Sequence, residues 1–262
     1  MDLNLSGRHA LVFGASEGIG QASALELALL GADVTVVARR RATLESVVAD
    51  LPQIAAGQRH GYRVADDAQP QALEAMLAEL VAERPVQVLV NNSGGPPGGR
   101  AIDADANAFL AAFQQHLLAN HARLQAVLPG MRAGGWGRVV NIVSTSVYEP
   151  IPNLGVSNTT RGAVASWAKT LSRELGPEGI TVNNVLPGYT RTARLDHIIK
   201  DRMAANGGSE DEALAAIASG VPVRRVAQAS EVAAAVAFLA SPAAGYITGV
   251  SLAVDGGRMQ SI

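Results

Sequence analysis

Three glycines near the start of the sequence have a spacing that suits phosphate binding. Gly14, Gly18 and Gly20 lie in the segment GASEGIG, between the apolar run HALVF and a run rich in alanine and leucine. Glycine permits the positive φ of a tight turn and lets a pyrophosphate approach bare N–H groups at a helix start. Because the loop joins a predicted strand to a predicted helix, it predicts a dinucleotide site.

A run of arginines follows the second predicted strand. Sites that accept NAD usually carry Asp or Glu at this point, for the ribose hydroxyls. This chain carries Arg39, Arg40 and Arg41 instead. The planar fork of arginine suits a 2′-phosphate, so the sequence favours NADP(H), with Arg39 or Arg40 as the ligand. The alternative is that all three are solvated residues at the start of a helix.

The elements that must position these residues alternate between strand and helix. Continuous apolar runs indicate strands buried on both faces, typical of a parallel sheet covered by helices. The sequence predicts a single-domain α/β fold over 1–262, a Rossmann-type doubly wound parallel sheet of about seven strands with helices on both faces. The expected strands include 9–14, 33–38, 86–92, 138–144, 180–188 and 251–257, and the expected helices 18–30, 41–50, 70–83, 105–132, 158–175 and 229–240.

The stretch 189–225 interrupts this alternation. It contains a Gly-Gly break followed by Ser209 and, three residues later, Glu212, which is the pattern of a helix capping box. We expect a helical insert beside the carboxyl edge of the sheet. It acts either as a mobile lid or as a helical hairpin that covers exposed core.

Composition narrows the class of protein. The 262 residues are 48% hydrophobic, carry a net charge of −2 and include no cysteine. A disulfide framework, a thiolate nucleophile and a cysteine metal site are therefore excluded. No basic surplus points to nucleic acid, and no apolar run is long enough for a membrane span. We expect a soluble, cytoplasmic protein with a small-molecule or acyl-thioester substrate and no bound metal.

Several motifs in order resemble those of the short-chain dehydrogenase/reductase family, and within it the β-ketoacyl-acyl-carrier-protein reductase type. The likeness covers nearly the whole chain, including NNSG (91–94), GRVVNIVS and VDGG (254–257). It implies NADP(H) as the cofactor and a homotetramer built through the long helices and the last strand. The cofactor contacts that it implies are Gly14, Ser16, Gly18, Ile19 and Gly20 in the loop, Asp66 at the adenine, Asn92 and Gly94, and Pro187, Gly188 and Thr192 at the nicotinamide.

The catalytic positions depart from the family pattern. The resemblance implies a serine that polarises the carbonyl, a tyrosine acid, a lysine and an asparagine that holds a relay water. Ser144 matches the serine, but Ser157 and Arg161 stand where the tyrosine and lysine are expected. The asparagine position falls on His116, and a shift of one helical turn would place Asn120 there instead.

These replacements change the proton chemistry. A serine hydroxyl relays a proton but is a poor acid, and arginine stays charged, so Arg161 is expected to bind the ribose or a phosphate. Three residues are candidates for the missing acid: Tyr148 first, then Tyr189 and His116, which titrates near pH 6.5 when unperturbed. Each also has a purely structural interpretation, as a packed tyrosine or a hydrogen-bonded histidine.

Two functions fit this pattern. The first is an NADP(H)-dependent oxidoreductase that interconverts a carbonyl and an alcohol, on a 3-oxoacyl thioester or related ketone, with an altered proton relay. The second is a nucleotide-binding protein of the same fold with little or no catalysis, which acts as a sensor or partner subunit. The retained Ser144 and Pro-Gly segment favour the enzyme.

Overall fold

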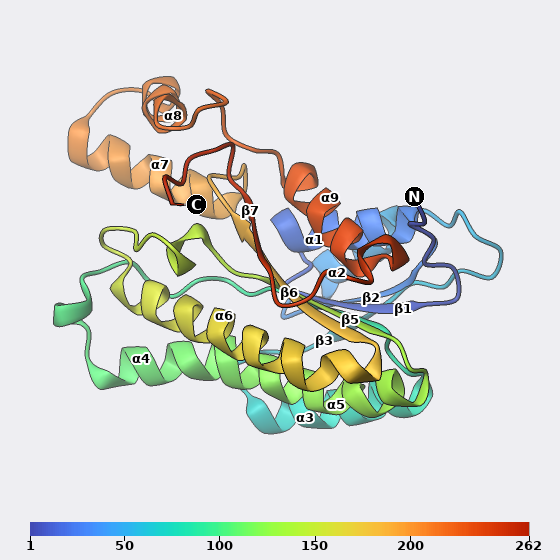
Figure 1. The fold of residues 1–262 in the computed structure, drawn as a ribbon. Coiled ribbons are helices and arrows are strands. Elements are labelled where there is room, and N and C mark those ends of the chain that lie inside the picture. Colours follow the sequence, from blue (N-terminus) through green and yellow to red (C-terminus); the bar gives the residue numbers. More distant parts are fainter. Residues whose placement is uncertain (262) are drawn as a thin grey trace.

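Seven parallel strands form one sheet at the centre of the molecule, in the order β3-β2-β1-β4-β5-β6-β7 (Figure 1). The computed structural model describes residues 1–261. The order reverses between β1 and β4, and in such sheets ligands bind at the carboxyl ends of the strands beside this switch. The strands are β1 (His9–Phe13), β2 (Asp33–Ala38), β3 (Gly61–Val64), β4 (Val88–Asn91), β5 (Gly137–Ile142), β6 (Ile180–Pro187) and β7 (Ser251–Val254).

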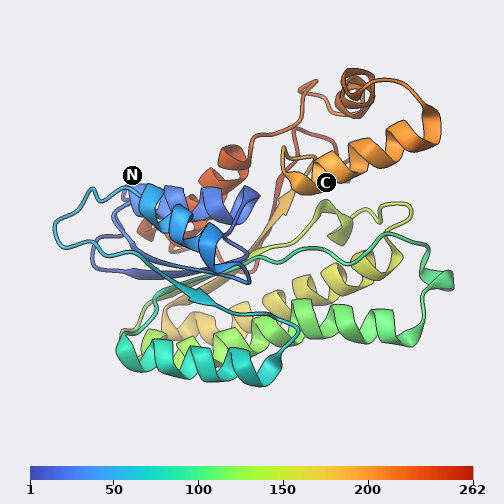
Figure 2. The ribbon, with the colours of Figure 1, turned by 180° about the vertical axis from the view of Figure 1, so that it is seen from behind.

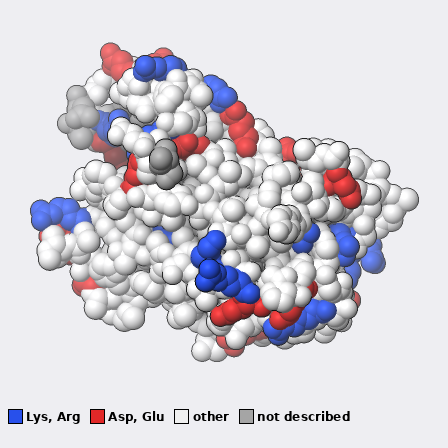
Figure 3. All heavy atoms as spheres, viewed as in Figure 1, with Lys and Arg blue, Asp and Glu red and all other residues white. Residues whose placement is uncertain are grey.

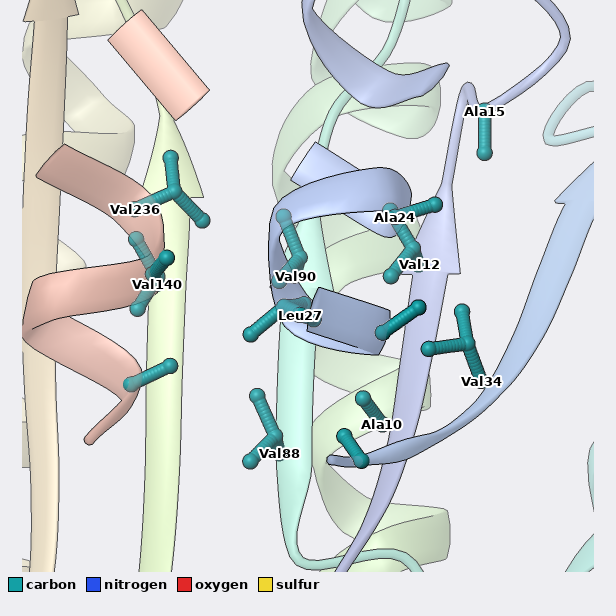
Figure 4. Close-up of a cluster of buried hydrophobic side chains, with 14 of the residues drawn as sticks. Ala10, Val12, Ala15, Ala24, Leu27, Val34, Val88, Val90, Val140 and Val236 are labelled. Atoms are coloured by element: carbon teal, nitrogen blue, oxygen red, sulfur yellow. The ribbon is translucent and has the colours of Figure 1, made fainter. Parts of the chain in front are cut away.

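Helices cover one face of the sheet with a closely packed apolar layer. They are α1 (Gly18–Leu29), α2 (Arg41–Asp50) and α9 (Ala229–Ala240). Figure 4 shows valines of β1, β4 and β5 that meet Ala24 and Leu27 of α1 and Val236 of α9. Small residues on these helices let them pack close to the sheet. This packing fixes α1, and with it the loop between β1 and α1.

The opposite face is covered by four helices, visible together from both sides in Figures 1 and 2. They are α3 (Pro70–Glu83), α4 (Ala106–Phe113), α5 (Ala119–Ala133) and α6 (Gly155–Leu175). Leucines of α3 and α5 pack on the strands in a second apolar cluster. Helices therefore lie on both faces, and the predicted doubly wound single-domain fold is confirmed.

One helix predicted as continuous contains an irregular turn. The expected helix 105–132 is divided into α4 and α5 by a π-helical turn over Gln114–Leu118. A π turn adds one residue to the helical repeat, and such turns often occur at functional sites. Here the added residue lies in the turn that carries His116.

The insert folds as α7 (Ala193–Asn206) and α8 (Glu210–Ser219), above the carboxyl edge of the sheet. The capping box predicted at Ser209 and Glu212 is present and begins α8. The base of the insert is closed by a parallel bridge between Thr190 and Ala227. Leu195 and Ile199 of α7 pack against Ile217 of α8, so the insert has a small apolar core of its own.

The last strand is shorter than the predicted 251–257. β7 ends at Val254 because Gly256 and Gly257 take positive φ values of 67° and 81°, which extended backbone does not allow. The Asp255 carboxylate accepts hydrogen bonds from the N–H groups of Gly257 and Met259 and fixes this turn. Within the described residues, no helix is both long and apolar enough to cross a membrane.

Candidate active site

A cavity of about 1340 Å³ opens at the carboxyl ends of the strands, beneath the insert. Its walls come from segments far apart in the sequence, including the glycine loop after β1, the NNSG segment after β4 and the end of β5. Residues from the N-terminal parts of α6 and α7 complete it. The fold therefore brings the predicted nucleotide segments and the predicted catalytic segments to one site.

The glycine loop has the geometry that a dinucleotide cradle needs. Gly14 and Gly18 have φ values of +59° and +60°, which residues with a side chain rarely adopt. Gly20 does not line the cavity; a Cβ there would overlap the Gly14 carbonyl and the Asn92 side chain. Asn92 Nδ2 donates a hydrogen bond of 3.1 Å to that carbonyl and joins the loop to β4. Bare backbone at this helix start fits a pyrophosphate.

The three arginines after β2 diverge. Arg39 and Arg40 are exposed and line the cavity, and Arg40 forms a 3.0 Å ion pair with Glu17. Arg41 turns away and donates a hydrogen bond to the Tyr62 hydroxyl. Arg39 and Arg40 therefore stand where a 2′-phosphate ligand is expected.

Two neighbouring acids after β3 have different partners. Asp66 lines the cavity and accepts a hydrogen bond from the Ala68 N–H group. Asp67 pairs with Arg123, a fully buried residue whose guanidinium lies 3.7 Å from the centre of the Phe13 ring. Asn120, the alternative relay asparagine, accepts a 2.8 Å hydrogen bond from Arg123 and does not line the cavity. Asn120 thus has a structural role, as a hydrogen-bond acceptor for the buried Arg123.

Ser144, Ser157 and Arg161 line the same cavity. Ser144 follows β5, and its Oγ accepts a hydrogen bond from the Ser146 N–H group. Ser157 and Arg161 lie one turn apart on α6, which puts them on one helix face. Burial, and then the nearby positive charge of Arg194, lower the pKa of Arg161 to about 10, so its guanidinium is still charged at neutral pH.

His116 is buried behind the cavity wall rather than exposed in it. Its Nδ1 lies 2.7 Å from the hydroxyl oxygen of Ser93, which does line the cavity. Burial is the largest cause that lowers the pKa of His116 to about 3, followed by the charges of Arg161 and Arg123. The imidazole is therefore neutral at physiological pH, and the expected titration near pH 6.5 does not hold.

The two candidate tyrosines are placed differently from the expected order. Tyr148 is half exposed, and it is not among the residues that line the cavity. Residues 145–147 form a short 3-10 turn after Ser144, which carries Tyr148 outward. Tyr189 lies on the cavity wall, directly after Gly188. The structure thus brings Tyr189, and not Tyr148, to the site.

The Pro-Gly segment places Thr192 over the glycine loop. Pro187, Gly188 and Thr192 all line the cavity, as do Ser16, Ile19 and Gly94. A Cβ on Gly18 would come within 3.1 Å of Thr192 Cγ2, so the two walls nearly touch here. A Cβ on Gly188 would lie 2.7 Å from Asp255 Cα, so this turn also needs glycine for close packing.

Sequence reasoning did not identify two cationic residues on the wall. Arg194, in the first turn of α7, donates a 3.5 Å hydrogen bond across the mouth to the Gly95 carbonyl. Arg258 lies after the β7 turn, with its guanidinium 5.0 Å from the centre of the Tyr189 ring. Both fall just beyond the motifs that the resemblance matched, and only the fold brings them to Ser144.

Comparison with known proteins gives a consistent family. The family model described as "Enoyl-(Acyl carrier protein) reductase" matches residues 14–258. The chain is 34% identical to the NADPH-dependent reductase BacG of Bacillus subtilis, over 98% of this chain and 100% of that protein. It is 33% identical to the 3-oxoacyl-[acyl-carrier-protein] reductase FabG of Pseudomonas aeruginosa, over 99% and 100%.

A solved structure agrees with these matches. The L-sorbose reductase of Gluconobacter frateurii, complexed with NADPH and L-sorbose, superposes with a TM-score of 0.93 at 29% identity, covering all of both chains. Sheet order, glycine loop and full-length similarity therefore agree with one another. The chain belongs to the short-chain dehydrogenase/reductase family.

Proposed function

We propose that the protein reduces a ketone to an alcohol with NADPH, through a proton relay altered from the family pattern. One observation carries this proposal: Ser144, Ser157 and Arg161 share a cavity with the glycine loop and Thr192. The relatives named above are reductases, two of them linked to NADPH by name or by bound ligand, which agrees with NADP(H) as the cofactor.

The residues present fit this cofactor. Gly14 and Gly18 take positive φ, and Gly20 leaves room for contact between the loop and Asn92, so backbone N–H groups are open to phosphate oxygens. Arg39 and Arg40 line the cavity where the 2′-phosphate is expected to bind. Bound NADPH supplies a hydride to the substrate carbonyl carbon. The protein's own contribution is to bind, orient and stabilise charge.

Ser144 and Arg161 serve the developing negative charge. The Ser144 hydroxyl donates a hydrogen bond to the substrate carbonyl oxygen, which polarises it. Arg161 holds its positive charge at the same cavity, and a fixed charge in a partly buried site stabilises an alkoxide more than it would in water. The Ser157 hydroxyl relays a proton by accepting one hydrogen bond and donating another, but it is too weak an acid to supply the proton itself.

Tyr189 is the proton donor in this proposal. The chain has four tyrosines, and among the described residues Tyr189 is the one that lines the cavity. His116 remains neutral, so it accepts or passes a hydrogen bond through Ser93 but does not supply the proton itself. Tyr189 therefore takes the role that was expected first of Tyr148.

The test is NADPH oxidation with 3-oxoacyl thioesters, quinones and small ketones as substrates. We expect turnover of at least one ketone, and Ser144→Ala should remove most of it because the carbonyl loses its hydrogen-bond donor. An unchanged rate in Ser144→Ala would place the chemistry elsewhere. If neither the natural protein nor a variant with Ser157→Tyr and Arg161→Lys reduces any of these compounds, the nucleotide-binding function without catalysis becomes the better account.

A homotetramer is the assembly that we propose. β7 is an edge strand, and the exposed Leu252 on it, with Leu110 and Leu118 on the α4–α5 face, offers apolar surface for subunit contact. Light scattering at micromolar concentration tests this, and a monomer would contradict it. The cytoplasmic location and the role of residues 189–225 as a lid stay predictions from the sequence.

A further inference from the structure

Four arginines line the cavity on α6, on α7 and after β7. They are Arg161, Arg194, Arg202 and Arg258, and one acid, Asp201 on α7, lines it with them. Among the described residues, no carboxylate lies within ion-pair distance of these four guanidinium groups. In the face shown in Figure 3, by contrast, basic and acidic side chains are scattered among uncharged ones. These segments therefore give the cavity wall a positive charge.

The remaining acids on the wall lie on the nucleotide side, and two of them are paired. Glu17 pairs with Arg40, and Asp67 pairs with the buried Arg123. Asp66 accepts a hydrogen bond from the Ala68 N–H group. None of them forms an ion pair with the four arginines. Burial lowers the pKa of Arg161, and the like charge of Arg194 lowers it further.

Arg258 is held in place by the chain that carries it. The Glu149 carboxylate accepts hydrogen bonds of 2.6 and 2.7 Å from the N–H groups of Gln260 and Ser261. Those bonds, and to a smaller extent the charge of Arg258, lower the pKa of Glu149, which is therefore ionised and engaged with the tail at neutral pH. The glycine turn after β7 fixes the other side of Arg258. The guanidinium is thus positioned before any substrate arrives.

Arg258 lies at the same end of β5 as Ser144. Arg258 Nη1 is 3.4 Å from Thr145 Oγ1, and Thr145 directly follows Ser144, with Cα atoms about 3.8 Å apart. Arg258 and Ser144 also line the same cavity. The phosphate of a pantetheine arm lies many bonds from its thioester carbonyl, so this neighbourhood favours a charged group close to the reacting carbonyl.

We propose that the substrate is a small oxo acid whose carboxylate is bound by Arg258, with Arg194 on the facing wall. This rests on the proposed function for the reacting carbonyl, but the anion subsite is a separate property. Arginine binds a carboxylate through two parallel hydrogen bonds, which fixes the orientation of the carbonyl as well as its affinity. The subsite selects 2-oxo or 3-oxo acids over neutral ketones and over thioesters.

Binding to the protein loaded with NADP⁺ tests the subsite without turnover. Calorimetry compares 2-oxohexanoate and 3-oxohexanoate with their methyl esters and with two 3-oxohexanoyl thioesters, one of coenzyme A and one of N-acetylcysteamine. We expect at least one acid to bind about tenfold or more tightly than its ester. Tighter binding of the coenzyme A thioester than of both acids would assign the arginines to a phosphate and overturn the proposal.

Variants test whether Arg258 causes the preference for the acid over its ester. Arg258→Gln should weaken the acid about tenfold or more and leave its ester unchanged, while Arg258→Lys should retain part of the preference. Arg173→Gln, on the exposed side of α6, is the matched control and should change nothing. If Arg258→Gln binds acid and ester as the natural protein does, the subsite is refuted, even where ketones are reduced. If the acid binds through Arg258 but is never reduced, the subsite stands and the proposed reductase activity fails.

Discussion

Arg161 Nη1 donates a 3.1 Å hydrogen bond to the carbonyl oxygen of Ile142 and so ties α6 to the end of β5. Its Nε has no hydrogen-bond partner among the described residues. One part of the guanidinium thus has a structural role, although the side chain also lines the cavity. A lysine in this place would have a single ammonium group instead of a fork.

This arrangement predicts the effect on ketone reduction of introducing the tyrosine and the lysine of the family pattern. Ser157→Tyr alone should raise ketone reduction little, because the guanidinium keeps its bond to β5 and gives the new hydroxyl a bulkier neighbour. Ser157→Tyr with Arg161→Lys should raise kcat about tenfold or more, because the ammonium group lowers the pKa of the introduced tyrosine, which then adds a second proton donor to Tyr189. Steady-state kinetics with one ketone measures this. A double variant no faster than the natural protein would contradict the assigned positions.

Cofactor preference follows from the arginines after β2. NADPH should bind more tightly than NADH in calorimetric titrations. Arg39→Asp should reduce NADPH affinity about tenfold or more and leave NADH nearly unchanged, because a carboxylate would then face the 2′-phosphate. Arg41→Asp is the matched control, as Arg41 bonds to Tyr62 instead of lining the cavity. Equal affinities for both cofactors in the natural protein would refute the preference.

Removal of one hydroxyl tests the proton donor. Tyr189→Phe should lower kcat for ketone reduction by about 10²-fold or more and keep the ring under Arg258, since the general acid alone is lost. Tyr148→Phe should leave kcat unchanged, because Tyr148 lies outside the cavity. The pH profile of kcat separates a proton role from a packing role. Equal rates in both variants would show that Tyr189 is not the donor.

Buried histidines predict a loss of stability in acid. Burial, and next the charge of Arg84, lower the pKa of His9 to about 4, and the pKa of His116 is about 3. Each takes up a proton on unfolding below pH 6.5, so the free energy of unfolding should fall by about 1.4 kcal/mol per pH unit for each histidine between pH 6 and 5, and by less for His9 as the pH nears its folded pKa. Above pH 7 this contribution is fully present.

Urea unfolding at pH 7.5, 6 and 5 measures that slope. His116→Asn should make it shallower by the share of one histidine, because asparagine takes up no proton. His197→Asn, at an exposed position on α7, is the control and should leave the slope as it is. A slope that is the same in His116→Asn would mean that the imidazole is protonated in the native state.

Most of the expected nucleotide contacts came from the family resemblance and stay predictions. Periodicity and glycine spacing were enough to predict the sheet, its helices and the glycine loop between β1 and α1. Those features depend on local patterns, such as apolar runs and a turn that needs positive φ. The π turn at His116 was beyond such reasoning, because one added residue leaves the apolar pattern of the helix nearly unchanged. Sequence also ordered Tyr148 before Tyr189, since distance along the chain from Ser144 does not show which way a short turn directs a side chain.

The arginines of the cavity wall could not be predicted from the sequence for a related reason. Arg194 and Arg258 are separated by a long stretch of chain and meet only through the insert and the turn after β7. No local pattern distinguishes them from the exposed arginines elsewhere in the sequence. Their importance comes from their place on the wall of one cavity, which is a property of the tertiary structure alone.

The closed base of the insert has a consequence for how such an enzyme diversifies. Tyr189 and Arg191 exchange backbone hydrogen bonds of 2.9 and 2.8 Å with Ala227, so residues 192–226 leave and rejoin the sheet at one fixed point. Lengthening a loop between fixed anchors costs little entropy, about 0.6 kcal/mol per doubling. Helices of other lengths and charges can therefore follow Thr192 between these anchors while the nucleotide half, with Thr192, stays unchanged, and substrate range becomes an exchangeable module.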